Sequence, residues 1–170
     1  MDNQALQQRL ATRADLLTLW DVWENEPDIS QSLLDEVNIG TPHIAGYSVE
    51  AKRNASDMNY QSFLQYFSLA NVDAAASTGA ERERVRVPGL HSDGSAGQEE
   101  RAFAQCLCAA FDVAAIDAQL RRSGSGAAVF DGIRRQIAAR REFSHYTLEA
   151  ALSPANAERL AGLGFEVHLL

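Results

Sequence analysis

The sequence has no long hydrophobic run and only two cysteines. No apolar stretch approaches the roughly 20 residues needed to cross a bilayer, and the polar start Met1-Asp2-Asn3-Gln4 lacks a secretory pattern. Cys106 and Cys108 are two residues apart, so on a helix they point to different faces and form neither a local disulfide nor a shared metal site. Both are predicted to be small residues in or near the core. We therefore expect a protein of the reducing cytoplasm with no membrane segment.

Basic residues are in the minority. Lys and Arg number 15 against 23 Asp and Glu, which gives a formal charge of −8 and a pI near 4.9. An acidic surface repels phosphate backbones, so no nucleic-acid partner is expected. One arginine-rich run, Arg134, Arg135, Arg140 and Arg141, is predicted to be the solvated flank of a helix that could pair with acids of a partner subunit.

The glycine-rich phosphate loop of dinucleotide-binding proteins is also missing. No G-x-G-x-x-G occurs, and Gly124 with Gly126 forms only a G-x-G that follows two arginines and no strand. The histidines at positions 91, 145 and 168 have no metal-ligand spacing, so no metal site is predicted.

Polar chemistry is concentrated between Asp21 and Lys52. This stretch contains the runs Asp21-Val22-Trp23-Glu24-Asn25-Glu26-Pro27 and Thr41-Pro42-His43-Ile44-Ala45-Gly46. A histidine can shuttle a proton near neutral pH, and a carboxylate can orient it and stabilise its charge. On sequence alone, a single loop histidine is more often a turn residue than a catalyst, and spacing does not show that these groups meet.

The two runs resemble the end of the nucleotide-binding domain of D-isomer-specific 2-hydroxyacid dehydrogenases. Phe130-Asp131-Gly132-Ile133-Arg134 and Arg140-Arg141-Glu142-Phe143-Ser144 are similar to the dimerisation domain of a branch that oxidises a small phosphorylated hydroxy acid with NAD. In that family the catalytic arginine, the phosphate loop and the substrate domain lie upstream. We therefore expect this chain to be a C-terminal segment of a larger enzyme, homodimeric, and inactive alone.

The resemblance also implies roles for individual residues. His43 would accept the proton of the substrate 2-hydroxyl, and Glu26 would hydrogen-bond the other ring nitrogen. Asp21 and Gly46 would contact the cofactor, with strand-end capping and a plain helix-start glycine as their structural alternatives. Tyr47 would bind substrate through its hydroxyl or serve only as a packing ring.

Hydrophobic periodicity and capping signals predict an α/β fold. Helices are expected at Asn3–Ala11, Ser32–Glu36 and Ser48–Phe67, around Phe103–Phe111 and Phe130–Ala138, and from Ser153-Pro154 to Gly162 or Gly164. Strands are expected at Leu16–Trp20, Val37–Ile39, Arg84–Val87, His145–Glu149 and Phe165–Leu169. The exposed stripe Tyr60, Phe63, Leu64 and Phe67 should seek cover from the C-terminal module or from another copy of the chain.

The predicted organisation is a Rossmann-type remnant with a return helix at 1–70, a linker at 71–83 and a small α/β dimerisation domain at 84–170. Three hypotheses remain open. The chain is an enzyme segment that retains Glu26, His43, Asp21, Gly46 and Tyr47; or it is a free-standing homodimerisation module with a vestigial site; or it is the product of a fragmentary gene that never accumulates.

Overall fold

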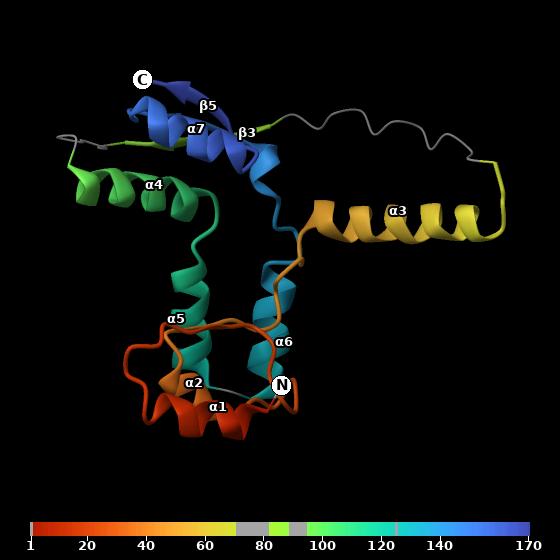
Figure 1. Cartoon of the computed structure of the whole chain (residues 1–170), viewed down its shortest axis with the longest axis vertical. Coiled ribbons are helices and arrows are strands. Elements are labelled where there is room, and N and C mark those ends of the chain that lie inside the picture. The colour runs from red at the N-terminus through yellow and green to blue at the C-terminus, as the bar shows by residue number, and fades with distance from the viewer. Residues whose placement is uncertain (1, 71–81, 89–94, 125) are drawn as a thin grey trace. The chain divides into compact units, whose positions relative to one another are not determined.

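A computed structural model describes residues 2–70, 82–88, 95–124 and 126–170, and they form an α/β protein (Figure 1). The predicted fold class, α/β, is confirmed, and both sheets are parallel. The described residues separate into two compact units, one of residues 1–47 with 113–140 and one of residues 48–112 with 141–170. The predicted boundaries at 70 and 84 stay predictions, and residues 71–81 of the predicted linker lie outside the described residues.

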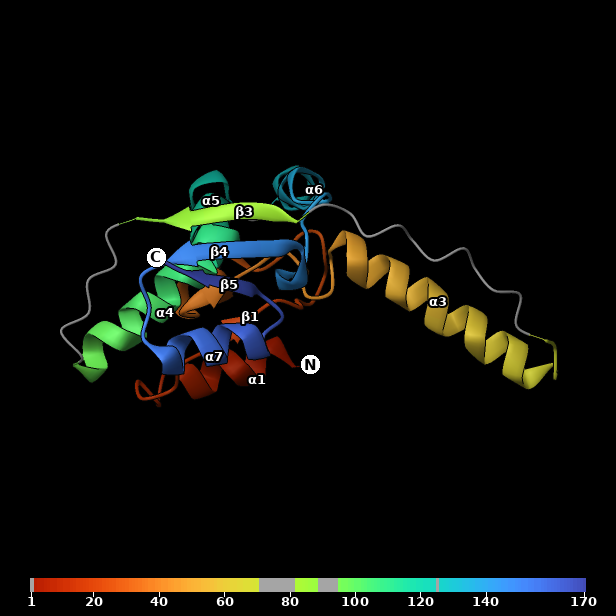
Figure 2. The same cartoon turned by 90° about the horizontal axis from the view of Figure 1, so that it is seen from above.

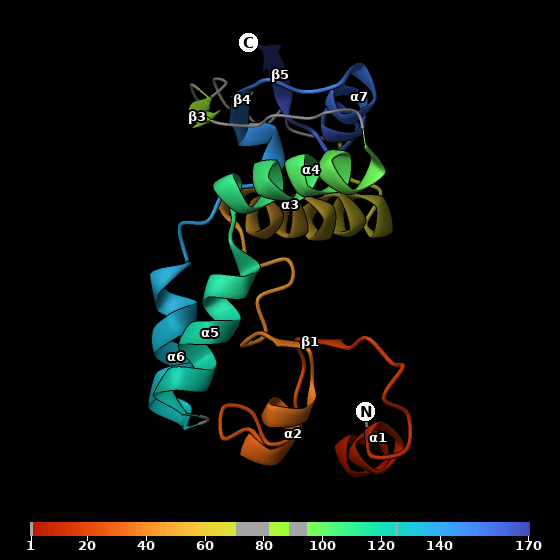
Figure 3. The same ribbon diagram turned by 90° about the vertical axis from the view of Figure 1, so that its left-hand side faces the viewer.

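The first unit joins the N-terminal residues to a later helix pair. Its elements are α1 (Asn3–Leu10), β1 (Leu19–Trp20), α2 (Gln31–Glu36), β2 (Ile39–Gly40), α5 (Val113–Ser123) and α6 (Ala127–Gln136). Helices α1 and α2 are neighbours, as Figure 3 shows. One core holds them together with the helix pair, and it consists of Trp23, Ile29, Leu33, Leu34, Val37, Leu120, Phe130 and Ile133.

Local signals set several boundaries in this unit. The Asp2 carboxylate accepts a hydrogen bond from the Ala5 N–H and caps α1, as its position predicts. Ser30 caps α2 in the same way. Val37 ends α2 in extended geometry, which moves the second strand to Ile39–Gly40 and makes the predicted start at Val37 wrong.

The strand predicted at Leu16–Trp20 is shorter and less buried than expected. Only Leu19 and Trp20 pair with β2, and Leu17 and Leu19 are 78% and 68% exposed. The sheet has two strands among the described residues, so it covers little of the apolar run. An apolar run of this length gives no information on how many strands flank it.

Helix α5 was not predicted. Val113, Ile116 and Leu120 do follow helical spacing, and Leu120 is fully buried. The pattern was obscured by the two arginines and the Ser/Gly stretch that follow. This omission matters for the site, because α5 reaches strand β2.

The second unit is built on the parallel sheet β3-β4-β5, seen from above in Figure 2. Its elements are α3 (Val49–Tyr66), β3 (Glu83–Val87), α4 (Ala96–Ala110), a 3₁₀ turn at Phe143–His145, β4 (Tyr146–Ala150), α7 (Pro154–Gly162) and β5 (Glu166–Leu169). The three predicted strands and the Ser153 cap are confirmed within one or two residues. The core centres on Leu148, Cys106, Leu160 and Phe165.

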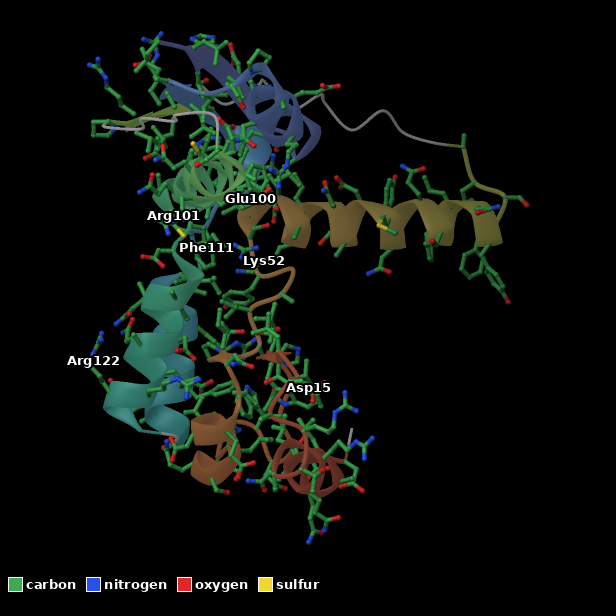
Figure 4. The ribbon with its side chains drawn as sticks, turned by 60° about the vertical axis from the view of Figure 1, so that its left-hand side comes forward. Asp15, Lys52, Glu100, Arg101, Phe111 and Arg122 are labelled. Atoms are coloured by element: carbon green, nitrogen blue, oxygen red, sulfur yellow. The ribbon has the colours of Figure 1, made fainter. Side chains whose placement is uncertain are left out.

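One side-chain prediction in this unit is wrong, and two others stay predictions. Cys106 is buried as predicted, but Cys108 is exposed, because residues two apart face different sides of α4. Arg141 pairs with Glu50 of its own chain, with Nε 2.5 Å from Oε1, and the predicted pairing of the arginine run with acids of a partner subunit stays a prediction. Tyr60, Phe63 and Phe67 are 40–56% exposed in the single chain, so their predicted cover by another copy stays a prediction, and Figure 4 shows side chains projecting from α3. No single helix among the described residues is long and apolar enough to span a membrane, and one broken pair, α4 with α5, passes by length and composition only.

Candidate active site

His43 and Glu26 lie together in the first unit. Nδ1 of His43 is 2.6 Å from Oε2 of Glu26, so the two side chains that the sequence predicts to pair do meet. The other carboxylate oxygen of Glu26 accepts a hydrogen bond from the Trp23 N–H at 2.6 Å. The Glu26 side chain is 22% exposed and that of His43 is 45% exposed. One partner is therefore held by the fold, and the other is open to a ligand.

The contact fixes which ring nitrogen can act as a base. A carboxylate accepts hydrogen bonds, so Nδ1 carries the hydrogen in the neutral ring and Nε2 keeps its lone pair. A proton taken up at Nε2 makes an imidazolium whose charge lies beside the carboxylate. The pair can thus accept and return one proton at a surface that solvent reaches.

Asp21 organises the loop that carries His43. Its Oδ1 accepts hydrogen bonds from Thr41 Oγ1 at 2.6 Å and the Ile44 N–H at 2.7 Å, and its Oδ2 accepts one from the Ala45 N–H at 3.0 Å. Its backbone carbonyl accepts from the His43 N–H at 2.9 Å. These bonds bracket His43, whose φ of 52° lies in the left-handed region that side chains with a Cβ rarely adopt. The structural alternative for Asp21, capping of the strand end, describes its observed contacts.

Trp23 and Gly40 also hold the loop that carries His43. The buried Trp23 indole donates to the Thr41 carbonyl at 2.8 Å. A Cβ on Gly40 would fall 2.6 Å from Leu34 Cδ1 and 3.0 Å from the Trp23 ring, so only glycine allows this approach. The tight packing fixes the residues that lead into Thr41-Pro42-His43.

The remaining predicted residues lie after His43. Gly46 has a φ of 68°, and nothing lies within 4 Å of where its Cβ would be. It is therefore needed for the turn and leaves open space beside the backbone. Tyr47 is half-buried, with the Arg134 guanidinium 5.0 Å from its ring centroid. The packing alternative for Tyr47 accounts for this contact, and its predicted role in substrate binding stays a prediction.

Two functional candidates were missed because they lie far from the loop in sequence. Asp117 of α5 accepts the Gly40 N–H at 2.7 Å, and Arg121 is paired with Asp117 at 2.8 Å. Asp and Arg at i and i+4 are a helix signal, but nothing in the sequence indicates that they reach β2. No group of three or more His, Cys, Asp or Glu among residues 2–70, 82–88, 95–124 and 126–170 is arranged to hold a metal ion.

Known proteins are similar to this chain over nearly its whole length. A family model described as a domain of unknown function (DUF3410) matches residues 84–164. The erythronate-4-phosphate dehydrogenase of Saccharophagus degradans is 40% identical over 98% of this chain and 43% of its own length. The predicted resemblance to the C-terminal part of these dehydrogenases is confirmed.

Other relatives with this name give the same picture. The erythronate-4-phosphate dehydrogenase of Yersinia enterocolitica is 34% identical over 100% of the chain and 44% of its own length, and that of Cellvibrio japonicus is 37% identical over 97% and 45%. The chain therefore spans less than half the length of the curated relatives it matches. Their names identify these relatives as dehydrogenases.

Proposed function

We propose that this chain supplies the proton-transfer part of an NAD-dependent dehydrogenase that oxidises 4-phospho-D-erythronate to the 2-oxo acid, in the biosynthesis of pyridoxal 5′-phosphate. The observation that carries the proposal is the 2.6 Å contact between His43 Nδ1 and Glu26 Oε2. It lies in the two sequence runs that resemble the family, and the matching relatives carry the name of this activity.

The chain's own residues define the proton path. The 2-hydroxyl of the substrate would donate its proton to Nε2 of His43, because forming a free alkoxide at the carbon that is oxidised is too costly. Glu26 would hold the ring in the tautomer that leaves Nε2 free and would stabilise the imidazolium. Asp21 would keep the loop in the geometry that presents the ring.

The residues present fit one end of the cofactor. NAD⁺, when bound, supplies the acceptor for the hydride that leaves C2 of the substrate. Gly46 offers an open backbone, and Asp21 Oδ2, to which the described residues donate a single hydrogen bond, retains capacity for another. The sequence has no glycine-rich phosphate loop, so we expect no measurable NADH affinity in this chain by itself.

A segment exchange tests the proposal. The C-terminal 168 matched residues of the Saccharophagus degradans enzyme are replaced by this chain, and NADH formation from 4-phosphoerythronate is followed by absorbance. We expect turnover, and a fall in kcat of about 10²–10⁴-fold when His43→Gln is added. A His43→Gln hybrid as active as its parent would refute the proton-acceptor role. Fluorescence titration of the isolated chain should show no NADH binding, and binding at millimolar or lower concentration would contradict the expected lack of affinity.

A homodimerisation module is the second candidate. The second unit has its own core, and α3 exposes Tyr60, Phe63, Tyr66 and Phe67 to an extent of 40–82%. Burial of such a stripe between copies would remove a large apolar area from water. We expect light scattering to give a dimer mass, in a cytoplasmic protein whose Cys106 and Cys108 are free thiols. A folded monomer would contradict it.

A further inference from the structure

Asp117 and Arg121 connect α5 to the strand that leads to His43. Asp117 Oδ1 accepts the Gly40 N–H at 2.7 Å. Arg121 Nε lies 2.9 Å from Oδ1 and 2.8 Å from Oδ2 of the same carboxylate. The Asp117 and Arg121 side chains are 14% and 27% exposed. The pair is thus mostly removed from solvent and makes several charge-assisted hydrogen bonds.

The hydrogen bond to Gly40 occupies the open edge of β2. The Ile39 N–H donates to the carbonyl of Thr18, just before β1, and the Thr41 N–H donates to that of Trp20 in β1. Backbone groups alternate along a strand, so the Gly40 N–H points to the opposite edge. Gly40 is buried, and an unpaired N–H there would cost about 1–3 kcal/mol. Asp117 therefore acts in place of a neighbouring strand at this position.

Arg121 extends the same connection to helix α2. Its guanidinium donates to the carbonyls of Leu34 and Val37, at the C-terminal end of α2. These carbonyls lack partners within the helix, and a cation suits that end of the helix dipole. The neighbouring Arg122 is exposed, and Figure 4 shows it directed away from the helix. Of these two adjacent arginines of α5, Arg121 therefore contacts the segment that precedes His43, and Arg122 does not.

The shifts in acidity agree with this geometry. Burial by itself would raise the pKa of Asp117, but the hydrogen bonds from Arg121 and the Gly40 N–H outweigh it and hold the pKa below its ordinary value. The pKa of Arg121 is raised, first by its hydrogen bond to Asp117. Both groups are therefore charged in the folded protein at neutral pH.

Gly40 is three residues before His43, and the residues between them are held on both sides. The Thr41 carbonyl accepts from the Trp23 indole, and Thr41 Oγ1 donates to Asp21. A displacement of Gly40 would therefore pass to the His43 backbone instead of being absorbed in a free loop. Glu26 lies in the other loop and accepts a hydrogen bond from the Trp23 backbone N–H. A shift of His43 alone would lengthen its contact with Glu26.

We propose that Asp117, anchored by Arg121, is a positioning residue for His43. It holds the edge of β2 at Gly40 so that the imidazole meets Glu26. The catalytic importance of this arrangement rests on the proposed function, but the arrangement itself can be tested without activity.

The test uses the 170-residue chain and NMR. Asp117→Asn keeps the side-chain volume and one oxygen acceptor, Asp117→Ala removes both, and Asp131→Asn and Arg122→Ala are controls on α6 and α5. Two signals are followed: exchange of the Gly40 amide hydrogen, and the ¹⁵N shifts of the His43 ring, assigned by their loss in His43→Gln. We expect Gly40 exchange to accelerate about tenfold or more in Asp117→Ala, as loss of roughly 1.4 kcal/mol implies. The His43 ring should move toward the Glu26→Gln spectrum, with Asp117→Asn intermediate and both controls unchanged.

The outcomes separate a positioning role from a purely structural one. Faster Gly40 exchange with an unchanged His43 ring would overturn the proposal, as would an unchanged Gly40. If Asp117→Ala does not fold, Asp117→Asn decides, and failure of that variant to fold would make Asp117 a folding residue and refute the positioning role. An inactive hybrid enzyme with intact coupling between Asp117 and His43 would instead refute the proposed function alone.

Discussion

Nδ1 of His43 lies 2.6 Å from Oε2 of Glu26, a residue 17 positions earlier in the chain. The two residues come from separate loops, one following β1 and one following β2. The carboxylate is fixed by the Trp23 N–H and the loop of His43 by Asp21. Glu26 and the loop of His43 are thus held by different hydrogen bonds, and variants can test the roles of Glu26 and Asp21 one at a time.

Replacing Glu26 by Gln should impair proton transfer more than binding. The amide can donate a hydrogen to Nδ1, which favours the tautomer with the hydrogen on Nε2, and it cannot stabilise an imidazolium. In the hybrid enzyme we expect kcat to fall about 10²–10⁴-fold with KM changed little. Steady-state kinetics measures both. A rise in KM with kcat intact would show that Glu26 serves binding and not proton transfer.

Asp21→Asn should destabilise the isolated chain in the absence of any cofactor. The carboxylate accepts three hydrogen bonds from the loop, and the amide nitrogen of Asn would face at least one donor. We expect the free energy of unfolding to fall by about 1–3 kcal/mol. Urea unfolding followed by tryptophan fluorescence measures this free energy, since Trp20 and Trp23 both lie in the first unit with Asp21.

The matched control for Asp21 is Asp15→Asn. Asp15 is 66% exposed and, among the described residues, pairs with the nearby Arg13, so its replacement should leave the free energy of unfolding close to that of the parent. Asp15 is labelled in Figure 4. Equal stability of the Asp21→Asn and Asp15→Asn chains would show that Asp21 does not organise the loop.

Gly40→Ala and Gly132→Ala should change the free energy of unfolding in opposite directions. The methyl group introduced by Gly40→Ala would overlap Leu34 and the Trp23 ring, and overpacking of this kind costs about 1–3 kcal/mol. Nothing lies within 4 Å of the Cβ position at Gly132, in the interior of α6, so alanine there should stabilise by up to about 1 kcal/mol. Urea midpoints of the two variants against the parent check the pair. If Gly40→Ala left the free energy of unfolding unchanged, the packing of Gly40 against Leu34 and Trp23 would be loose.

Acid should weaken the contact between Glu50 and Arg141 in the second unit. Burial would raise the pKa of Glu50, but hydrogen bonds from the Glu142 N–H and from Arg141 lower it more, so it lies below its ordinary value of 4.5. A depressed pKa in the folded state contributes stability above the unfolded pKa and loses it as pH falls through the folded value. Glu50→Gln should therefore be less stable than the parent at neutral pH, and the difference should vanish in acid.

Urea unfolding followed by circular dichroism at a series of pH values measures this difference. Glu100→Gln is the control, because its pair with Arg159 is exposed on the Glu100 side to 66% and is expected to add little. A difference between parent and Glu50→Gln that persists unchanged into acid would show that the carboxylate charge is not its source.

Much of the fold follows from short-range signals. Asp2, Ser48 and Ser153 each cap a helix at the predicted place. Capping is a short-range signal, because the cap side chain accepts a hydrogen bond from the backbone N–H only three residues later. The strands of the second unit follow from alternation and β-branched residues. Leu16 to Trp20 did not behave as a buried strand, because burial depends on neighbours that lie elsewhere in the chain.

The site divides in the same way. Its two loops, His43, Glu26 and the glycine at position 46 were identified from motifs that are continuous in sequence. The contact of Asp117 with Gly40 joins residues 77 apart, and no pattern in either segment indicates the other. The Asp21 carboxylate faces the loop backbone, and this too became evident only from the direction in which the loop N–H groups point.

The amino-acid sequence by itself determined the fold class, the helix caps at Asp2, Ser48 and Ser153, the net negative charge and which residues could transfer a proton, since these depend on side-chain chemistry and on spacing within a few residues. Only the tertiary structure decided that His43 meets Glu26, that Asp21 holds the loop and that α5 secures the strand edge. Those contacts depend on how distant segments pack around Trp23 and Leu34, and packing is a property of the whole chain in three dimensions.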